Sequence, residues 1–385
     1  MAETCSGTTP SRGRSDYYGG KIPWIKTGEL IDGEIHGTEE HVTEIAVKET
    51  RLRLLPKETL LVAMYGQGQT RGRTGLLKTE ATTNQACFAI LPNERFYSEF
   101  LQLWFCHSYQ RLRQQTEGRG GNQSNFNGAV LRDEAVPLPP LAEQRRIAGR
   151  LREQMVEVAR ARAAVQAQLA AAQALPAAVL RAHFTTPAAL RWPRRRLGEL
   201  CEIVAKQVDP RVKEFSSLPH VSGENIESRL CRLINVRSAG EDGMISGKYL
   251  FEPGDVLYSK LRPYLRKVAV AESRGLCSAD MYPIRVNADL LDAHFTAWLL
   301  LGEEFSSYAI EESQRSRMPK LNREELFRWS APVPPLAEQR ALAARLTTEL
   351  FAATCLRASL EARLSEIERL PAALLRTAFT PGQSA

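Results

Sequence analysis

The chain has 385 residues, with 51 Lys and Arg against 44 Asp and Glu, a net charge of +7 and 43% hydrophobic residues. This length predicts two or more domains, and the ordinary composition excludes a largely disordered chain. The basic excess favours a polyanionic partner, although many proteins without one reach the same balance. The seven cysteines are scattered without a C-x-x-C pair, which predicts neither a disulfide framework nor a zinc site. No secretory signal and no run of eighteen apolar residues is present, so we expect a cytoplasmic location.

The first 135 residues alternate short apolar runs with polar loops, as expected of a mixed α/β domain. LLVAMYG at 60–66 predicts a buried strand, and FLQLWFCHSYQRLRQQ at 100–115 predicts a helix with an apolar stripe. The loop after the strand carries side chains suited to DNA, because glutamine can bind adenine, arginine can bind guanine, and cations neutralise phosphates. A hairpin tip with solvated charges is the alternative, and the G-x-x-x-x-G-K-[ST] pattern of a nucleotide phosphate loop is absent. The predicted DNA contacts are Gln67, Gln69, Arg71, Arg73 and Lys78.

Residues 136–187 predict a long helix. Pro139 and Pro140 favour a helix start, the sequence from 141 to 175 is rich in good helix formers, and Pro176 then interrupts the pattern. Apolar residues recur at alternating steps of three and four, which is typical of a coiled-coil seam. The residues predicted to pair with another helix are Leu151, Met155, Val158, Arg162, Val165 and Leu169.

Residues 188–330 repeat the order of elements of the first domain with different loops. GDVLYSK at 254–260 predicts a strand, residues 295–313 predict a helix, and a polar loop at 314–322 leads towards a further strand. The recurrence of cationic loops at equivalent places in both halves favours DNA contact over solvated charge. The predicted contacts are Lys260, Arg262, Tyr264, Arg266, Lys267, Arg315, Arg317 and Lys320.

Residues 331–385 are a second copy of the central helix. PPLAEQR occurs identically at both helix starts, 195 positions apart, and the same offset relates LPAAVLRAHFTTP at 175–187 to LPAALLRTAFTP at 370–381. Pro371 interrupts the second pattern where Pro176 interrupts the first. Two seams of equal length predict that the helices pair with each other, and an amphipathic helix lying on its own domain is the alternative. The second set of pairing residues is Leu346, Leu350, Ala353, Arg357, Leu360 and Leu364.

We therefore predict an α+β chain with two mixed α/β domains, 1–135 and 188–330, in an approximately two-fold repeat. Two long antiparallel helices, 136–187 and 331–385, would join them as a coiled coil. Arg162 and Arg357 share a seam position, so they either form a common polar layer or direct their charges outward. The second half opens with WPRRRLGELCEI at 192–203, whereas Met1 falls about level with Leu197. The first domain is therefore expected to lack an edge strand or to have a misassigned start.

No catalytic pattern accompanies these elements. The aromatic proline motif of DNA methyltransferases, a carboxylate cluster with a lysine, and paired histidines are all missing from the sequence. We expect no catalytic residues and no metal site in this chain, so any reaction would be performed by a partner.

The duplicated PPLAEQR helices between two dissimilar domains resemble the specificity (S, HsdS) subunits of Type I restriction–modification systems. IPWIKTGEL at 22–30, GDVLYSKLRPYL at 254–265 and LPAALLRTAF at 370–379 add to this resemblance. The resemblance implies two target recognition domains that each read half of a bipartite site in double-stranded DNA. It also implies two methyltransferase (HsdM) subunits docked on the helices, with endonuclease–translocase (HsdR) subunits joining for cleavage.

S-adenosylmethionine, ATP and Mg²⁺ would then bind those partners, and this chain would hold no cofactor. Two other readings remain at this point. One is an enzyme in which recognition is fused to restriction or methylation, and the other is a coiled-coil scaffold without a DNA role.

Overall fold

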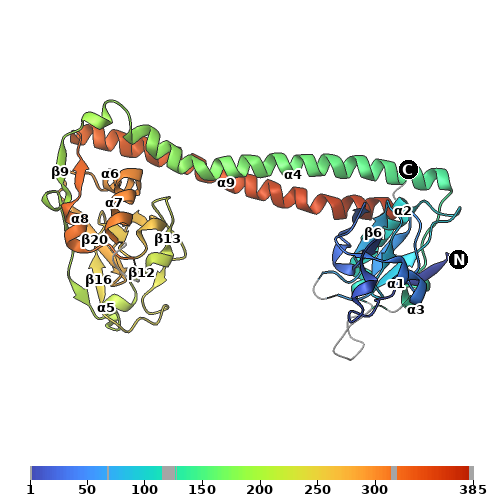
Figure 1. The fold of residues 1–385 in the computed structure, drawn as a ribbon. Coiled ribbons are helices and arrows are strands. Elements are labelled where there is room, and N and C mark those ends of the chain that lie inside the picture. The colour runs from blue at the N-terminus through green and yellow to red at the C-terminus, as the bar shows by residue number, and fades with distance from the viewer. Residues whose placement is uncertain (1, 67–68, 115–125, 127, 314–318, 381–385) are drawn as a thin grey trace. The chain divides into compact units, whose positions relative to one another are not determined.

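A computed structural model describes residues 2–66, 69–114, 126, 128–313 and 319–380. The chain divides into two compact units, of which unit 1 comprises Met1–Ala164 with Leu364–Ala385, and unit 2 comprises Val165–Arg363. Two long helices, α4 (Leu141–Phe184) and α9 (Leu336–Phe379), each contribute residues to both units (Figure 1). Each unit therefore contains one globular part and a portion of both helices.

Unit 1 is built on a five-stranded sheet in the order β1-β8-β5-β6-β3, beside a smaller sheet in the order β4-β2-β7. The four residues of β5 are all buried because alternate side chains enter two clusters, Leu60 and Val62 on one face and Leu61 and Ala63 on the other. A continuous apolar run is what a strand covered on both faces requires. Its elements are β1 (Thr4–Ser6), β2 (Tyr18–Ile25), β3 (Gly33–Ile35), β4 (His41–Val42), α1 (Glu44–Glu49), β5 (Leu60–Ala63), β6 (Thr74–Leu77), β7 (Thr82–Thr83), β8 (Cys87–Ile90), α2 (Ser98–Gln114) and α3 (Gly128–Arg132).

Unit 2 contains a four-stranded sheet in the order β10-β20-β17-β18 and a five-stranded sheet in the order β11-β16-β19-β12-β15. Two-stranded pairs, β13-β14 and β21-β9, complete it. Its elements are β9 (Arg194–Arg196), β10 (Cys201–Ile203), β11 (Gln207–Val208), α5 (Lys213–Ser216), β12 (Pro219–Val221), β13 (Ile226–Glu227), β14 (Arg232–Leu233), β15 (Arg237–Ser238), β16 (Lys248–Phe251), β17 (Val256–Ser259), β18 (Val268–Val270), β19 (Gly275–Cys277), β20 (Met281–Val286), α6 (Ala293–Leu301), α7 (Glu303–Ser313), α8 (Arg323–Arg328) and β21 (Ser330–Pro332).

The two units share one sheet and the central strands of the other, because β4-β2-β7 of unit 1 and β15-β12-β19 of unit 2 have the same order and directions. The order β1-β8-β5-β6 in unit 1 corresponds to β10-β20-β17-β18 in unit 2, and the strands predicted at 60–66 and 254–260 are β5 and β17. The predicted helix at 100–115 is α2, whereas the single helix predicted over 295–313 is wrong. It is two helices, α6 and α7, because the chain at Gly302 turns to an extended conformation and closes α6 by donating its N–H to Leu299 O at 3.1 Å.

An edge strand distinguishes unit 2 from unit 1. In unit 2, β9 pairs antiparallel with β21 just before the second PPLAEQR. The corresponding residues 135–137 of unit 1 belong to no strand in the part of the chain that the structure describes. The two alternatives for the first domain, a missing edge strand or a misassigned start, both stay predictions.

Both long helices continue through their internal prolines, so the predicted interruption at Pro176 and Pro371 is wrong. A proline inside a helix costs one backbone hydrogen bond and a steric clash. The turns after the prolines are held by burial, since Leu180 lies in the main core of unit 2 and Leu375 is 8% exposed. Tertiary packing therefore outweighs the local cost.

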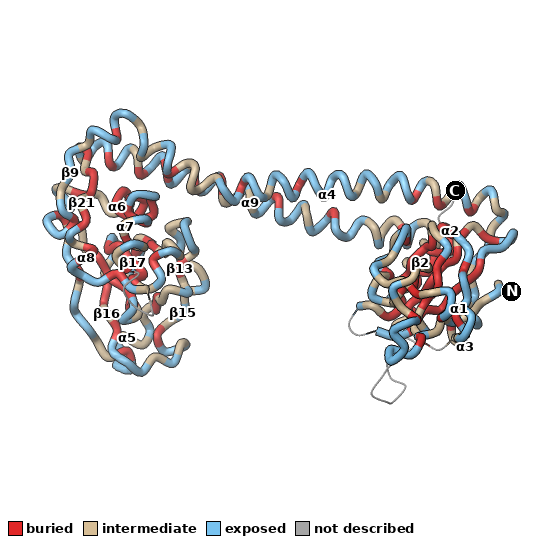
Figure 2. The backbone as a smooth tube through the Cα atoms, in the orientation of Figure 1, coloured by how far each residue is buried: buried red, intermediate tan, exposed pale blue. Residues whose placement is uncertain are grey.

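The helices pair antiparallel as a coiled coil. In unit 1 Arg162 lies 3.8 Å from Glu368, and in unit 2 His183 lies 2.9 Å from Glu349, so numbers rise along α4 as they fall along α9. Figure 2 shows buried positions recurring along both helices. Among the predicted pairing residues, Leu151, Val165, Leu346, Leu350, Ala353 and Leu360 are buried, Met155, Val158, Leu169, Arg357 and Leu364 are partly buried, and Arg162 is exposed.

The two seam arginines do not form a common layer. Arg162 is exposed and its guanidinium reaches Glu368 on the paired helix, whereas Arg357 donates to Glu227 of the β13-β14 pair at 2.8 Å. The outward reading is correct for Arg162. Arg357 instead ties α9 to the globular part of unit 2.

One helix among the described residues, α4, is long and apolar enough to cross a membrane by length and composition. The test concerns mean hydropathy over eighteen residues, and the low-charge part of α4 is not an unbroken apolar run, because Gln166, Gln168 and Gln173 lie within it. Alanine-rich turns with few charges meet this test, and in α4 they include Ala172, a small side chain that is buried.

Candidate nucleic-acid interface

The glutamine of each PPLAEQR anchors the long helix to the globular part of its unit. Gln144 is fully buried, accepts a hydrogen bond from Tyr97 N at 2.8 Å, and donates to the carbonyls of Arg95 at 3.1 Å and Pro139 at 2.8 Å. Tyr97 directly precedes α2, so this one carboxamide joins the start of α4 to the start of the domain helix. A buried carboxamide with all its partners fixes the local geometry.

Gln339 makes the same three contacts in unit 2. It accepts from Asp292 N at 2.9 Å and donates to the carbonyls of Leu290 at 2.9 Å and Pro334 at 2.8 Å. Every partner lies 195 positions after its counterpart in unit 1. The repeat therefore extends beyond the helices into the domain segment that receives them, which the sequence comparison did not show.

The far end of each helix is fixed by a phenylalanine at corresponding positions. In unit 2, Phe184 of α4 packs against Phe295 with ring centroids 6.1 Å apart. In unit 1, Phe379 of α9 packs against Phe100 at 5.3 Å. Each globular part thus receives the start of one helix and the end of the other.

In unit 1 the predicted DNA contacts divide into buried and accessible groups. Arg71 is 7% exposed and its guanidinium lies 5.7 Å from the Phe126 ring centroid. Lys78 is held by the carboxylate of Glu58 at 2.8 Å, with two further carboxylates within 4 Å. Both have structural contacts in this arrangement.

Gln69 is exposed, and its carboxamide accepts from Arg73, which also pairs with Asp32 at 3.1 Å. Gln67 lies outside the described residues. Contact of these side chains with DNA stays a prediction.

In unit 2 most of the predicted cations also serve the fold. Lys260 is 8% exposed, donates to Ala279 O, and lies 5.0 Å from the Tyr282 ring centroid. Burial is the main reason that its pKa lies below the ordinary lysine value. Arg266 pairs with Glu303 at 2.9 Å, and Lys267 donates to Gly223 O at 2.5 Å.

Arg262, Tyr264 and Lys320 remain exposed and are brought together. Arg262 adopts a left-handed conformation with φ 51° and donates its N–H to Pro319 O at 2.8 Å, which places it beside Lys320. These are the candidates of unit 2 whose charged or aromatic ends reach solvent. Arg315 and Arg317 lie outside the described residues, and DNA contact by this group stays a prediction.

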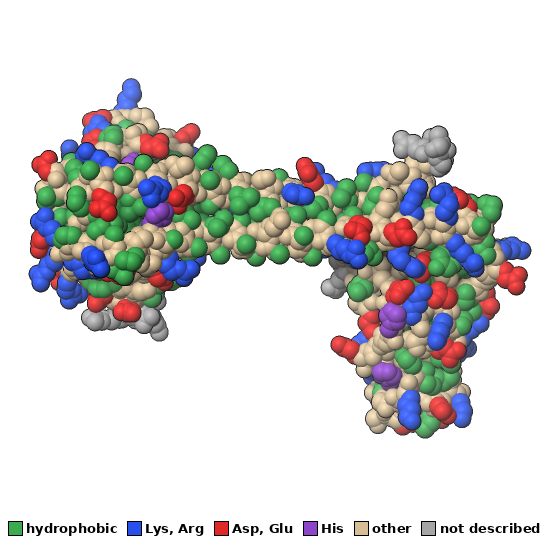
Figure 3. Space-filling view, turned by 90° about the horizontal axis from the view of Figure 1, so that it is seen from above, with side chains coloured by type: hydrophobic (Ala, Val, Ile, Leu, Met, Phe, Trp, Pro, Cys, Tyr) green, Lys and Arg blue, Asp and Glu red, His purple; other side chains and the backbone are tan. Residues whose placement is uncertain are grey.

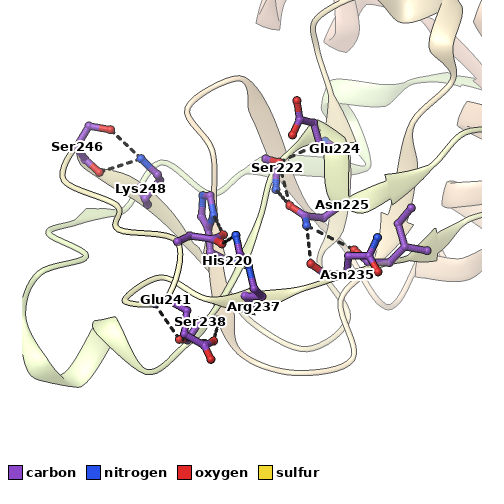
Figure 4. A network of polar contacts seen from close by, with 12 residues as sticks. His220, Ser222, Glu224, Asn225, Asn235, Arg237, Ser238, Glu241, Ser246 and Lys248 are labelled. Carbon is purple, nitrogen blue, oxygen red and sulfur yellow. Dashed lines mark hydrogen bonds and ion pairs between the residues drawn. The ribbon is translucent and has the colours of Figure 1, made fainter. Parts of the chain in front are cut away.

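Unit 2 contains a polar pocket that could not be predicted from the sequence. It has a volume of about 410 Å³ and is lined by residues from β12, β15, β16 and the neighbouring loops (Figure 4). His220 was interpreted as an isolated histidine, because Asp242, its partner at 2.9 Å, lies 22 residues later in the sequence. No spacing rule links them, since only the pairing of β12 with β15 brings their segments together.

The described residues contain no group of three or more His, Cys, Asp or Glu that could hold a metal ion. Burial raises the pKa of the Cys106, Cys201 and Cys231 thiols to about 12, which keeps them protonated at neutral pH. These partly buried cysteines are packing residues rather than nucleophiles.

Residues 1–154 match the family model of the Type I restriction modification DNA specificity domain. The chain is 33% identical over 189 residues to the Type I restriction enzyme EcoDI specificity subunit of Escherichia coli, covering 49% of this chain and 41% of that one. It is 32% identical over 151 residues to the MjaIX specificity subunit of Methanocaldococcus jannaschii, covering 38% and 34%. The matches thus span less than half the length of these two relatives.

Solved structures extend the likeness in fold to nearly the whole chain. The HsdS subunit from Thermoanaerobacter tengcongensis superposes with a TM-score of 0.64 at 21% identity, covering 93% of this chain and 90% of that one. A chain from a study of complex assembly and conformational transition of the type I R-M system reaches a TM-score of 0.72 at 20% identity, covering 98% and 95%. The chain is thus similar to Type I restriction–modification specificity subunits, in sequence over part of its length and in fold over nearly all of it.

Proposed function

We propose that this chain reads a bipartite site in double-stranded DNA as the specificity subunit of a Type I restriction–modification complex. The repeat of one sheet and one anchoring glutamine in both units carries this proposal, because it holds two dissimilar loop sets on equivalent supports. Two readers built on one framework suit two different half-sites. Phosphate contacts would give affinity, and base contacts would give specificity.

The proposal assigns catalysis to partner subunits. Two methyltransferase subunits would dock on α4 and α9, and endonuclease–translocase subunits would join them in the cytoplasm. The helices offer an apolar surface for this purpose, which Figure 3 shows as hydrophobic side chains gathered along both helices. Phe351 is 68% exposed there, and residues of α4 and α9 in unit 1 line a groove of about 710 Å³. Exposed apolar patches of this kind mark protein interfaces. S-adenosylmethionine, ATP and Mg²⁺ would be bound by those partners.

A domain exchange tests the proposal. Residues 1–135 are replaced by the first domain of another specificity subunit that keeps an aromatic residue at the position of Phe100, so that Phe379 retains its contact. The recognised sequence is then determined by selecting binding sites from random DNA. We expect one half-site to change and the other to stay. Changes in both half-sites would contradict the two-reader arrangement.

The two alternative functions give different results in the same preparation. Methyl transfer by the purified chain alone would indicate a fused enzyme. Failure of the chain and its methyltransferase to bind any DNA at low salt would indicate a scaffold without a DNA role.

A further inference from the structure

The polar pocket of unit 2 contains a buried histidine with one unsatisfied nitrogen. His220, on β12, is 4% exposed, and its Nδ1 lies 2.9 Å from Asp242 Oδ2. Its Nε2 is buried and has no hydrogen-bond partner in the described part of the chain. A buried polar atom left unpaired costs about 1–3 kcal/mol, so its persistence calls for a ligand that pairs with it.

The hydrogen bonds around His220 determine what that ligand must offer. Asp242 also accepts from Arg237 at 2.8 Å, and its pKa lies below the ordinary value because His220 and Arg237 donate to the carboxylate. An ionised carboxylate only accepts, so in the neutral form of the ring Nδ1 carries the hydrogen. Nε2 then presents a lone pair, and it requires a donor.

The other lining groups add both donors and acceptors. Asn235 is exposed and adopts a left-handed backbone conformation with φ 49°. Its side-chain carboxamide makes no hydrogen bond with the described residues. Lys248 is 6% exposed, and its ammonium group donates two hydrogen bonds to Ser246, one to the carbonyl at 3.0 Å and one to the hydroxyl at 2.7 Å. Asn225, by contrast, is occupied in capping the turn at Ser222. Figure 4 shows these side chains gathered around the pocket.

Because the pocket is lined by both hydrogen-bond donors and acceptors, a ligand that offers acceptors alone fits it poorly. A phosphodiester of the DNA backbone offers only acceptors, whereas Nε2 of the neutral ring needs a donor and the carboxylates of Glu224 and Asp242 line the same pocket. The major-groove edge of a base pair offers both kinds of group. Adenine and cytosine present exocyclic amines that donate, and a carboxamide such as that of Asn235 can bind adenine through two hydrogen bonds.

We propose that this pocket reads one base in the half-site recognised by unit 2, with His220 Nε2 accepting from the exocyclic amine of adenine or cytosine. Asp242 is the positioning residue that fixes the tautomer of His220, and Asn235 is the second base contact. The inference rests on the proposed function and assigns the residues for one of its two readers. In the sheet that holds the pocket, the strands β15-β12-β19 repeat β4-β2-β7 of unit 1 in order and direction, and β16 and β11 extend this sheet in unit 2.

The test selects binding sites from random double-stranded DNA with the full chain bound to its methyltransferase partner. The variants are His220→Ala and Asn235→Ala, and His294→Ala, an exposed histidine on α6, is the matched control. We expect His220→Ala to relax the base preference at one position of one half-site by about tenfold, with the other half-site unchanged. Asn235→Ala should relax the same or the adjacent position, and His294→Ala should select the wild-type site.

The results separate the two proposals. Wild-type selection without a bipartite site would overturn the proposed function itself. A bipartite wild-type site with every base preference retained in both pocket variants would overturn only the pocket assignment. Uniform weakening on all sequences would indicate a phosphate contact and would overturn it as well. If thermal unfolding shows that His220→Ala does not fold, Asn235→Ala, at an exposed position, decides the matter alone.

Discussion

At the scale of single residues, the repeated glutamines are the most informative side chains of the molecule. Gln144 and Gln339 look unremarkable in the sequence, as polar members of a helix-forming stretch. The structure gives each three hydrogen bonds and no exposure. Their identity is therefore required by the junction between a long helix and a domain helix, rather than by contact with DNA or a partner.

Replacing Gln339 with Ala should destabilise unit 2. The change leaves the amide of Asp292 and two carbonyls buried without partners, which costs about 2–4 kcal/mol in total. Hydrogen exchange should show loss of protection at Asp292 N–H, and urea unfolding should show the lower stability. Gln166→Ala, at an exposed position of α4, is the control. A loss of less than 1 kcal/mol would contradict the anchoring role.

Asp242 should make the stability of unit 2 depend on pH in the acid range. Its pKa is lowered by the hydrogen bond from His220, so its stabilising effect is complete above the ordinary aspartate pKa of about 3.9 and is lost as pH falls through the lower folded value. We expect Asp242→Asn to be less stable than the wild type at pH 5, with a difference that shrinks at pH 3 and below. Urea unfolding across this range measures it, and Asp289→Asn, an exposed change in the same unit, controls for the removal of one charge. A difference that stays constant with pH would refute the assignment.

At the scale of elements, the units differ most clearly at the edge strand. In unit 2, β9 covers β21, and Leu197 directly after it is fully buried. In unit 1 a largely apolar groove of about 300 Å³ lies beside the corresponding residues, lined by Val136, Leu138 and core side chains such as Phe88. The same framework is filled in one unit and open in the other.

Supplying the missing strand should stabilise unit 1. Residues 192–198 are copied ahead of Ala2 in place of Met1, so that the added leucine reaches the groove. Burial of one leucine side chain and a new strand pair should raise the unfolding temperature of unit 1 by roughly 3–6 °C. Differential scanning calorimetry measures the change. A Gly-Ser segment of equal length should leave the temperature unchanged, and equal effects of both segments would show that the groove is not filled.

At the scale of the whole molecule, the end of the chain belongs to the first unit. Leu364–Ala385 is assigned to unit 1, and Phe379 packs against Phe100 and, at 5.5 Å, against His107. Unit 1 is therefore made of two separate stretches of sequence, whereas unit 2 is one continuous stretch, Val165–Arg363. This arrangement couples the two termini of the chain through one core.

Truncation after Arg363 should loosen unit 1 and spare unit 2. Loss of the packed α9 segment and its phenylalanine should cost unit 1 about 2–4 kcal/mol. Hydrogen exchange should rise in α2 while protection in α6 stays as in the full chain. A truncation after Phe379 serves as the control, since it keeps the aromatic contact. Equal loss of protection in both helices would contradict the division into units.

The repeat, the pairing of the two long helices and the strands β5 and β17 can all be predicted from the sequence alone. The spacing of apolar residues and the 195-residue offset between the copies are visible there. The sequence could not show that the helices pass through Pro176 and Pro371, since burial of the following turns outweighs the proline cost only once the core is assembled. Lys260, Lys78 and Arg71 are predicted as DNA contacts from their charge, and only the structure shows that each also has contacts within its own unit. The His220 pocket was decided by tertiary structure alone. Its partners are separated in sequence, and a strand pairing brings them within hydrogen-bonding distance.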